Sequence, residues 1–586
     1  MKNSFYIAAF ALISFASCNN TQNAKHAATP KNDDSLNISF DDYSNKFLTE
    51  LWKQEPEMAT QQGYHLNDSV LKIPNDAYWN EGLAFVNSNL ETLKAFDTSM
   101  LTPSHLTDMK MIQNYLESKQ WGIQTLKQFE WDPSAYNITG LIAFMVASND
   151  QPADIRLENV YKRMQQVPAY YEAAKANLKN PVDELKSLGI AQNEGGLSVI
   201  ESDFVDSVKA SNFSEEKKYK MLLAAKNAAH AIKGYVAYLK SMKGYTPRSF
   251  RLGKDLYAKK FELDIQSNLT AEETYKAALE RKDFLHGEMA KISKQLWPKY
   301  FGSKTMPSDN LQLIAAMIDT LSMVHVKPED FQSAIEKEIP TLVQFIKTKN
   351  LLYIDSTKPL VIRKEPAYMA GVAGASISAP GPYDKEGKTY YNVGSLEGWP
   401  ADKAESYLRE YNQYILQILC IHEAIPGHYT QLVYANRSPS LIKAIFGNGA
   451  MVEGWAVYTE QMMLENGFGD NAPEMWLMWY KWHLRTVCNT ILDYSVHAGD
   501  MSKEQAMNLL TQEAFQQQAE AEGKWKRVSV TSVQLTSYFA GYKAIYDLRE
   551  KIKAKEGKRF DLRVFHEKFL SYGSAPVKYI SALMLN

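Results

Sequence analysis

The sequence contains few cysteines, no excess of charge of either sign and no long hydrophobic run. Three cysteines in 586 residues cannot form a disulfide framework. The 65 Lys and Arg residues are balanced by 67 Asp and Glu residues, and no basic stripe is visible, which argues against nucleic acid as a partner. The apolar run at residues 5–15 is too short to cross a membrane as a helix. With 45% hydrophobic and 23% charged residues, the composition favours a large soluble globular protein.

The motifs of several common enzyme classes are also absent. The segment Gly374–Ser378 begins like the elbow of a nucleophilic serine but lacks the closing glycine. The sequence has no phosphate-binding loop of the G-x-x-x-x-G-K-[ST] type and no C-x-x-C pair for a structural zinc. No repeat recurs at a fixed spacing, which excludes a solenoid array.

The N-terminus resembles the export signal of a bacterial lipoprotein. Lys2 precedes the apolar run, and Phe-Ala-Ser-Cys at positions 15–18 follows it as a candidate lipobox, with Phe where that pattern usually has Leu. We therefore expect a signal peptide at residues 1–17, then a lipidated Cys18 that begins a polar, flexible tether over residues 18–38. The lipid would anchor an exported protein on the periplasmic side of a bacterial membrane or at the cell surface. The alternative is a plain signal peptide cleaved near Ala16-Ser17.

Most of the remaining chain shows helical periodicity. At roughly 150 residues per domain the length would allow about four domains, but we expect one mainly α-helical domain over residues 39–586, with two lobes around a cleft as a variant. Thr270 and Glu273 form a candidate capping box. The β-branched and aromatic residues between Pro and Gly at 351–393 predict a small β-sheet or hairpin. The predicted helices are 215–242, 308–320, 329–348, 403–424, 452–465, 475–496, 503–518, 531–553 and 562–571.

The segment His-Glu-Ala-Ile-Pro-Gly-His at residues 422–428 carries the strongest chemical signal. In the zinc peptidase motif H-E-x-x-H, two histidines on adjacent helical turns bind zinc and the glutamate activates water. Here the second histidine follows six positions after the first, and on a regular helix the two side chains would point roughly 120° apart. Pro426 and Gly427 predict a helix break that returns His428 to the side of His422. A helix end with solvent-facing polar residues is the alternative, which the apolar flanks disfavour.

A catalytic zinc ion needs a third protein ligand and one open position. Glu453, which begins Glu-Gly-Trp-Ala-Val-Tyr on the next predicted helix, is the candidate third ligand, with a surface carboxylate as the alternative. Glu423 is adjacent to a ligand but points away from it, so it is the candidate general base. Glu460 lies two turns beyond Glu453 on the same helix face and is a candidate to orient His422 or His428.

Together these motifs resemble the DUF885 family of bacterial proteins. That family carries H-E-A-x-P-G-H followed by E-G-W-A-x-Y and is similar to zinc-dependent peptidases, which implies a large helical fold and a bound Zn²⁺ ion. The resemblance extends from about Phe40 to the C-terminus and is strongest after Leu360. Asn489 stands where the family usually has a second arginine, and Tyr429 replaces a second histidine. The downstream matches are Asp493, His497, Ser502–Ala506, Gln534–Tyr538 and Gly541.

The resemblance implies roles for three further side chains. Amide hydrolysis builds negative charge on the carbonyl oxygen, and that charge needs hydrogen-bond donors besides the metal. By analogy with helical zinc peptidases, Tyr538 and His497 are the candidate donors, with a purely structural position as the alternative for each. Arg485 is a candidate partner for a substrate carboxylate. The strand at Gly374–Ser378 is a candidate to pair with an extended peptide.

We therefore predict a zinc-dependent metallohydrolase, in the first place a peptidase, with Zn²⁺ held by His422, His428 and Glu453. Arg485 favours exopeptidase action, of the carboxypeptidase or dipeptidase type, on short peptides. Two alternatives stay open: a non-catalytic helical lipoprotein that binds glycans or peptides, and a zinc amidase that acts on cell-wall peptides. Cys420 and Cys488 are either buried thiols or one disulfide.

Overall fold

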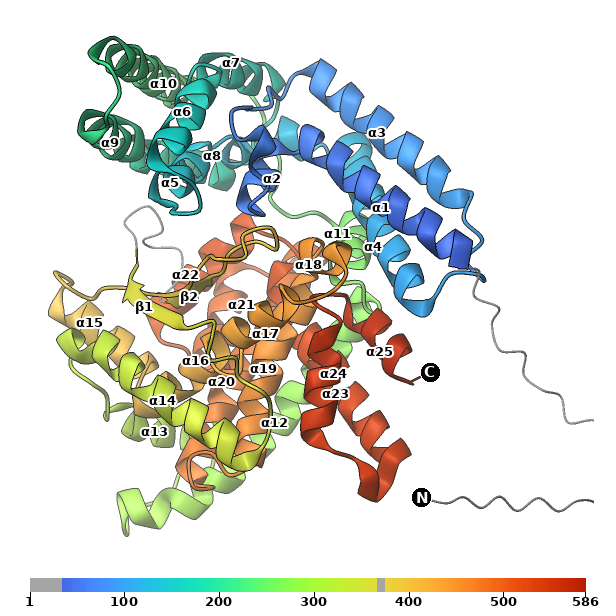
Figure 1. Cartoon of the computed structure of the whole chain (residues 1–586). Helices are drawn as coiled ribbons and strands as arrows, with labels where there is room; N and C mark the ends of the chain where they lie inside the picture. The colour runs from blue at the N-terminus through green and yellow to red at the C-terminus, as the bar shows by residue number, and fades with distance from the viewer. Residues whose placement is uncertain (1–33, 366–374, 586) are drawn as a thin grey trace, which may run out of the picture.

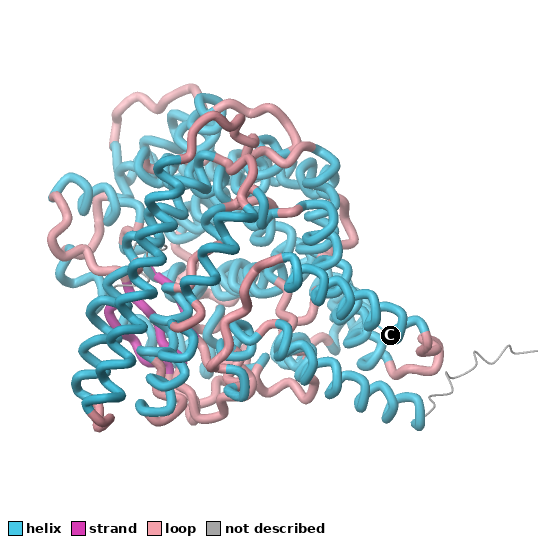
Figure 2. The backbone as a smooth tube through the Cα atoms, turned by 90° about the horizontal axis from the view of Figure 1, so that it is seen from above, coloured by secondary structure: helices cyan, strands magenta, loops and turns pink. Residues whose placement is uncertain are grey.

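The computed structural model describes residues 34–365 and 375–585, and Figures 1 and 2 show that these residues are mainly α-helical. This confirms the predicted fold class. The predicted signal peptide and the lipobox with Cys18 lie outside the described residues. The helices are α1 (Asp34–Gln54), α2 (Pro56–Gln61), α3 (Asp76–Lys94), α4 (Pro103–Trp121), α5 (Thr139–Ala147), α6 (Ala153–Met164), α7 (Val167–Asn177), α8 (Asp183–Gly195), α9 (Phe204–Ala210), α10 (Glu215–Ser241), α11 (Lys254–Ile265), α12 (Ala271–Phe301), α13 (Asn310–Ser322), α14 (Phe331–Lys349), α15 (Ala401–Glu410), α16 (Gln413–Glu423), α17 (His428–Ala435), α18 (Leu441–Ile445), α19 (Gly449–Glu465), α20 (Pro473–His497), α21 (Lys503–Asn508), α22 (Gln518–Val530), α23 (Ser537–Glu556), α24 (Leu562–Ser571) and α25 (Val577–Leu585).

The folded part of the chain begins earlier than the sequence predicts. Residues 34–38, which we assigned to the tether, already belong to α1. Asp34 lies in the first turn of this helix, where its negative charge interacts favourably with the positive end of the helix dipole. Asn37 is buried and its side-chain oxygen accepts a hydrogen bond of 2.9 Å from the backbone N–H of Thr102. The tether prediction was therefore wrong over these five residues, because a buried asparagine looks like a solvated one in sequence.

The segment after α14 forms the predicted small sheet. Its strands are β1 (Leu360–Lys364), β2 (Ala375–Ser378) and β3 (Thr389–Val393), in the order β1-β3-β2. The pair β1–β3 is parallel and the pair β2–β3 is antiparallel, so β2 lies at one edge of the sheet, where it also contacts α16. Residues 366–374, which include most of the Gly-rich stretch, lie outside the described residues.

Several predicted helices are confirmed to within a few residues, including α10, α13, α14, α19, α20 and α24. The predicted capping box at Thr270 and Glu273 opens α12. The predicted helix over 403–424 was wrong, because it is divided into α15 and α16. Asn412 causes the division: its side chain accepts hydrogen bonds from the backbone N–H groups of Tyr414 and Ile415 and so caps α16.

The sequence analysis also missed α22. The predicted helix over 503–518 is α21 followed by a single π-helical turn, and the chain turns at Phe515, whose φ angle is 55°. The helix predicted over 531–553 begins at Ser537, because Val533 has a φ angle of 68° and interrupts it. Neither turn contains glycine, so neither carries the usual signal for a positive φ angle.

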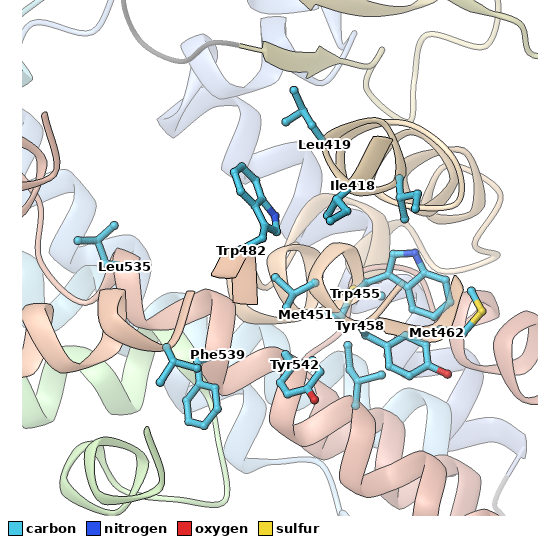
Figure 3. Packing of buried hydrophobic residues seen from close by; sticks show 14 of the residues in the cluster. Ile418, Leu419, Met451, Trp455, Tyr458, Met462, Trp482, Leu535, Phe539 and Tyr542 are labelled. Atoms are coloured by element: carbon cyan, nitrogen blue, oxygen red, sulfur yellow. The ribbon is translucent and has the colours of Figure 1, made fainter. Parts of the chain in front are cut away.

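The described residues pack around one large hydrophobic core and two smaller ones. A smaller core is built mainly from α5–α10, which gather at one end of the molecule in Figure 1. The large core includes α16, α19, α20 and α23, and Figure 3 shows part of it around Ile418, Trp455, Trp482 and Tyr542. Among the described residues, no helix is both long and apolar enough to cross a membrane.

Two helices of the large core cross at a pair of glycines. A Cβ atom on Gly541 of α23 would lie 1.6 Å from the carbonyl oxygen of Ala450 in α19. A Cβ atom on Gly454 of α19 would lie 2.3 Å from the carbonyl carbon of Gly541. Only glycine permits this close approach. Glu453 directly precedes Gly454, and Tyr538 lies about one helical turn before Gly541, so the contact brings these two candidate site residues to the same region of the core.

The two internal cysteines are free and buried, so Cys420 in α16 and Cys488 in α20 are thiols rather than a disulfide.

The glycine crossing predicts a selective loss of stability. Replacement of Gly541 by Ala should lower the free energy of unfolding by at least about 1–3 kcal/mol, because the added methyl group overpacks the α19–α23 contact. The matched control is Gly523→Ala in α22, where a Cβ atom meets no heavy atom within 4 Å; it should be neutral or stabilising by up to about 1 kcal/mol. Urea denaturation followed by circular dichroism measures both, and equal effects would refute the assigned role of the crossing.

Candidate metal centre

The two histidines of the His-Glu-Ala-Ile-Pro-Gly-His segment face each other across a break between helices. The helix α16 ends at Glu423 and α17 begins at His428, which confirms the predicted break. The bond between Ile425 and Pro426 is cis. Gly427 donates its backbone N–H to the carbonyl oxygen of Ile421 at 3.0 Å, and a Cβ atom on Gly427 would lie 1.8 Å from the carbonyl oxygen of His422. The turn therefore requires glycine, and it leaves the two imidazole rings 4.8 Å apart and nearly perpendicular.

The third predicted ligand, Glu453, points at both histidines. Its Oε2 atom lies 3.4 Å from Nε2 of His428 and 3.8 Å from Nε2 of His422. The helix that carries it is tied to the turn between α16 and α17, because the indole N–H of Trp455 donates a hydrogen bond of 2.9 Å to the carbonyl oxygen of Pro426. Two histidine nitrogens and one carboxylate oxygen thus converge from three separate helices.

Glu460 orients His422 from behind. Its Oε1 atom lies 2.7 Å from Nδ1 of His422 and also accepts a hydrogen bond of 3.1 Å from the indole N–H of Trp482. The Glu460 side chain is fully buried. A carboxylate at Nδ1 fixes the imidazole ring of His422 with its Nε2 atom toward Glu453, which is the arrangement common behind metal-bound histidines.

The electrostatics of the cluster suit a cation. The Oε2 atom of Glu453 is buried without a hydrogen-bond partner among the described residues. Burial opposes ionisation of Glu453, but the two histidines outweigh it and lower the pKa of the carboxyl group. Burial likewise opposes the charge on His422, yet Glu453 and Glu460 raise the pKa of its imidazole to about 10. The donor set of two imidazoles and one carboxylate is one that zinc accepts, so His422, His428 and Glu453 could hold such an ion.

Glu423 lies beside these ligands with a free carboxylate. One of its oxygens and one nitrogen from each of His422 and His428 lie within 4.8 Å of one another. Its carboxylate makes no hydrogen bond to any residue in the described ranges, and the side chain is partly exposed. Burial raises the pKa of Glu423, and the two histidines only partly oppose this shift. A carboxylate with a raised pKa next to a candidate metal site suits a general base.

Tyr538 is the predicted donor that the structure brings to the cluster. Its ring stacks with the imidazole of His422 at a centroid distance of 6.5 Å, and its hydroxyl accepts a hydrogen bond of 3.2 Å from Arg527. Burial raises the pKa of Tyr538 to about 12, and the charge of Glu453 adds to this. The hydroxyl therefore keeps its proton at neutral pH and could donate it in a hydrogen bond.

His497 contacts other partners. Its Nε2 atom lies 2.9 Å from the carbonyl oxygens of both Val528 and Thr531, and burial lowers the pKa of the ring to about 4. One turn earlier, Asp493 accepts a hydrogen bond of 3.1 Å from the backbone N–H of Val533. Together they hold the turn that precedes Tyr538, so the contacts in the described part of the chain favour a positioning role for His497 over direct contact with substrate.

Arg485 already has a carboxylate partner within the protein. Its Nη2 and Nε atoms donate to Oε1 of Glu520 at 2.5 Å and 3.1 Å, and its guanidinium lies 4.6 Å from the ring centroid of Trp482. A substrate carboxylate would have to compete with Glu520 for this arginine. The structure therefore places Arg485 near the cluster, through Trp482 and Glu460, but does not leave it unpaired.

Two cations near the cluster escaped the sequence analysis. Lys524 and Arg527 lie on α22, the helix that was not predicted. With Glu520 they repeat at intervals of four and three residues, which places all three on one helix face. This helical spacing of charged residues was the available signal, but the turn at Phe515 hid the start of the helix.

The chain matches a family model and is similar to solved structures. The chain matches the family described as "Bacterial protein of unknown function (DUF885)" over residues 56–584. A solved structure of a putative lipoprotein of unknown function from Shewanella oneidensis is 51% identical, covers 93% of this chain and all of its own, and has a TM-score of 0.84. A putative lipoprotein from Colwellia psychrerythraea is 16% identical, covers 93% of this chain and 98% of its own, and has a TM-score of 0.75, so it shows the fold alone.

A search of curated proteins found no match. Both solved relatives carry the description of a putative lipoprotein, which agrees with the lipobox predicted at Cys18. The family match covers most of the chain, including every residue of the cluster formed by His422, Glu423, His428, Glu453 and Glu460. The chain therefore belongs to the DUF885 family.

Proposed function

We propose that the protein is a zinc-dependent hydrolase that cleaves peptides. The observation that carries the proposal is the convergence of His422, His428 and Glu453 from three helices, with an otherwise unpartnered Glu423 carboxylate beside them. The Oε2 atom of Glu453 is buried, and the Nε2 atoms of His428 and His422 lie 3.4 and 3.8 Å from it, so a cation between the three side chains would give this oxygen a closer partner. A zinc ion held here would supply Lewis acidity toward a carbonyl group and toward water.

The protein residues would divide the remaining chemistry. Glu423, with its raised pKa, takes a proton from the attacking water and later delivers it to the leaving amine. Tyr538, which is protonated at neutral pH, donates a hydrogen bond to the carbonyl oxygen as negative charge develops there. Glu460 keeps His422 in one tautomer and one orientation.

The sheet supports a peptide as the substrate. The strand β2 is at the edge of the sheet and contacts α16, the helix that carries His422 and Glu423. An edge strand can pair with an extended peptide through backbone hydrogen bonds, which orients the peptide without reading its side chains. A cell-wall amidase would use the same chemistry on a different amide, and a non-catalytic binding lipoprotein would leave the His-Glu cluster without a role.

The N-terminal signal indicates where in the cell the protein would act. We infer that Cys18 carries a lipid and anchors the protein to the periplasmic side of a bacterial membrane or to the cell surface. The predicted lipobox and the description of both solved relatives as putative lipoproteins support this.

Metal analysis tests the centre directly. Protein purified after zinc-replete expression should contain about one zinc ion per chain. His428→Ala should lose most of it, because two ligands remain, whereas His230→Gln on the exposed face of α10 should retain it. Elemental mass spectrometry gives the stoichiometry, and wild-type protein free of zinc would refute the metal centre.

Glu423→Gln separates binding of the metal from catalysis. The variant should keep the zinc content of the wild type and lose about 10²- to 10⁴-fold in turnover, because the amide cannot accept a proton. Digestion of a peptide library, read by mass spectrometry, measures the turnover and locates the cleaved bond. The matched control Glu405→Gln, at an exposed position of α15, should cleave like the wild type. Full activity of Glu423→Gln would exclude this residue as the base.

Cys18→Ser tests the anchor. The lipid is attached through the sulfur atom of the cysteine, so serine at this position cannot carry it. The variant should therefore move from the membrane fraction to the soluble fraction when cells are fractionated. Cys420→Ser, at a buried position in α16, is the control and should stay in the membrane fraction if it folds. Membrane association of Cys18→Ser would contradict the lipoprotein assignment.

A further inference from the structure

A group of charged side chains lies next to the metal centre on α15, α20 and α22. Trp482 connects the two regions: its indole N–H binds Glu460, and the guanidinium of Arg485 stacks on its ring. Arg527 provides a second connection through its hydrogen bond to Tyr538. The members of the group are Glu410, Lys481, Arg485, Glu520, Lys524 and Arg527.

Two of the four cations in this group are paired. Lys481 and Glu410 form an ion pair of 2.6 Å, and each side chain is only 4% exposed. Arg485 uses Oε1 of Glu520 as its partner for both of its hydrogen bonds. The second oxygen of Glu410 is buried without a hydrogen-bond partner among the described residues, but no carboxylate oxygen lies at hydrogen-bond distance from Lys524 or Arg527.

Lys524 differs from the paired members of the group because it is nearly buried and has no hydrogen-bonded carboxylate partner. Its side chain is 4% exposed, yet its ammonium makes no hydrogen bond to any residue in the described ranges. The nearest carboxylate oxygen, Oε1 of Glu520, is 3.8 Å away and already binds Arg485. Burial lowers the pKa of Lys524 well below its usual value, and the charge of Arg485 adds to this. The Lys524 ammonium thus lies at a nearly buried position without a hydrogen-bonded counter-ion, where an added anion would provide one.

Arg527 extends the cationic surface toward the metal centre. It lies one helical turn after Lys524 on the same face of α22. Its Nη2 atom donates to the neutral oxygens of Gln534 and Tyr538, at 2.7 Å and 3.2 Å, and these bonds leave its charge uncompensated. Through Tyr538, this guanidinium is the member of the group that is linked most directly to His422.

We propose that Lys524 and Arg527 bind the C-terminal carboxylate of a peptide substrate and so make the protein a carboxypeptidase. This inference rests on the proposed function. A carboxylate between the two side chains supplies the missing negative charge and accepts charge-assisted hydrogen bonds. The sequence analysis assigned the binding of a substrate carboxylate to Arg485. We assign it to Lys524 and Arg527 instead, because Arg485 already forms an ion pair with Glu520.

The position of the subsite favours a chain terminus over an internal acidic side chain. One extended residue spans only about 3.3–3.6 Å, and Arg527 is within hydrogen-bond distance of Tyr538, the candidate donor to the reacting carbonyl. A peptide whose terminal carboxylate binds here therefore presents a bond close to its C-terminus to the metal centre.

Matched peptides test the proposal on the zinc-loaded, full-length protein. The probes are N-acetyl-tetraalanine with a free C-terminus, the same peptide as its C-terminal amide, and an amide peptide with one internal glutamate. The free acid should have the highest kcat/KM, by about 10- to 100-fold, the usual range for loss of one hydrogen bond to a charged group. Lys524→Met should raise the KM of the free acid by a similar factor, change kcat little and leave the amide unaffected.

Controls separate binding of the carboxylate from folding. Lys526→Met removes an exposed charge from the same helix and should behave like the wild type. Lys524→Arg keeps the charge and should recover part of the selectivity, and thermal unfolding checks that each variant folds. Equal cleavage of acid and amide, or equal loss on both in Lys524→Met, would overturn the subsite. Preferential cleavage of the glutamate peptide would overturn the terminal assignment.

Isothermal titration calorimetry of the same peptides with Glu423→Gln tests the carboxylate subsite separately from the proposed hydrolase activity. If no peptide is cleaved by the wild type but the free acid still binds more tightly than the amide, the carboxylate subsite stands and the hydrolase proposal fails. If cleavage occurs without this preference in binding, the hydrolase proposal stands and the subsite fails.

Discussion

The backbone of Gly427 approaches the end of α16 so closely that a Cβ atom there would lie 1.8 Å from the carbonyl oxygen of His422. This turn is the constraint on which the site depends, because it reverses the separation that six residues of regular helix would impose on the two histidines. A second close approach, between Gly454 and Gly541, packs α19, the helix that carries Glu453, against α23. The hydrogen bond from Trp455 to Pro426 joins the two features, so the three candidate ligands are held by packing that tolerates little displacement.

This packed region contains two neighbouring clusters of opposite charge, one rich in carboxylates and one rich in cations. Three carboxylates, those of Glu423, Glu453 and Glu460, lie around the two histidines, which favours an added cation, and the donor set fits zinc. A short distance away, on α20 and α22, cations outnumber carboxylates, which favours an added anion. Trp482 lies between the two regions and contacts both. A peptide with a free carboxylate, bound with its reacting carbonyl at the metal centre, would satisfy both demands at once.

Sequence reasoning identified the residues that the structure brings together in the candidate centre, because they belong to short local motifs. The pair Pro426-Gly427 predicted the helix break, and the helical spacing from Glu453 predicted that Glu460 could stand behind a histidine. It failed where tertiary contacts decide local structure. Val533 adopts a positive φ angle without being glycine, and Asn412 ends one helix and caps the next with no signal that distinguishes it from a mid-helix asparagine. The cations of α22 were lost with that helix, since a charge run reads as a solvated surface until the fold buries it.

The central claim is that His422, His428 and Glu453 hold one zinc ion. The most direct measurement is an anomalous difference map from crystals of the wild-type protein, with data collected on both sides of the zinc absorption edge. The account predicts a single strong peak at about 2.0–2.2 Å from a nitrogen of each histidine and from an oxygen of Glu453. The absence of a peak at these side chains in zinc-supplemented crystals, or a peak bound by other residues, would contradict it.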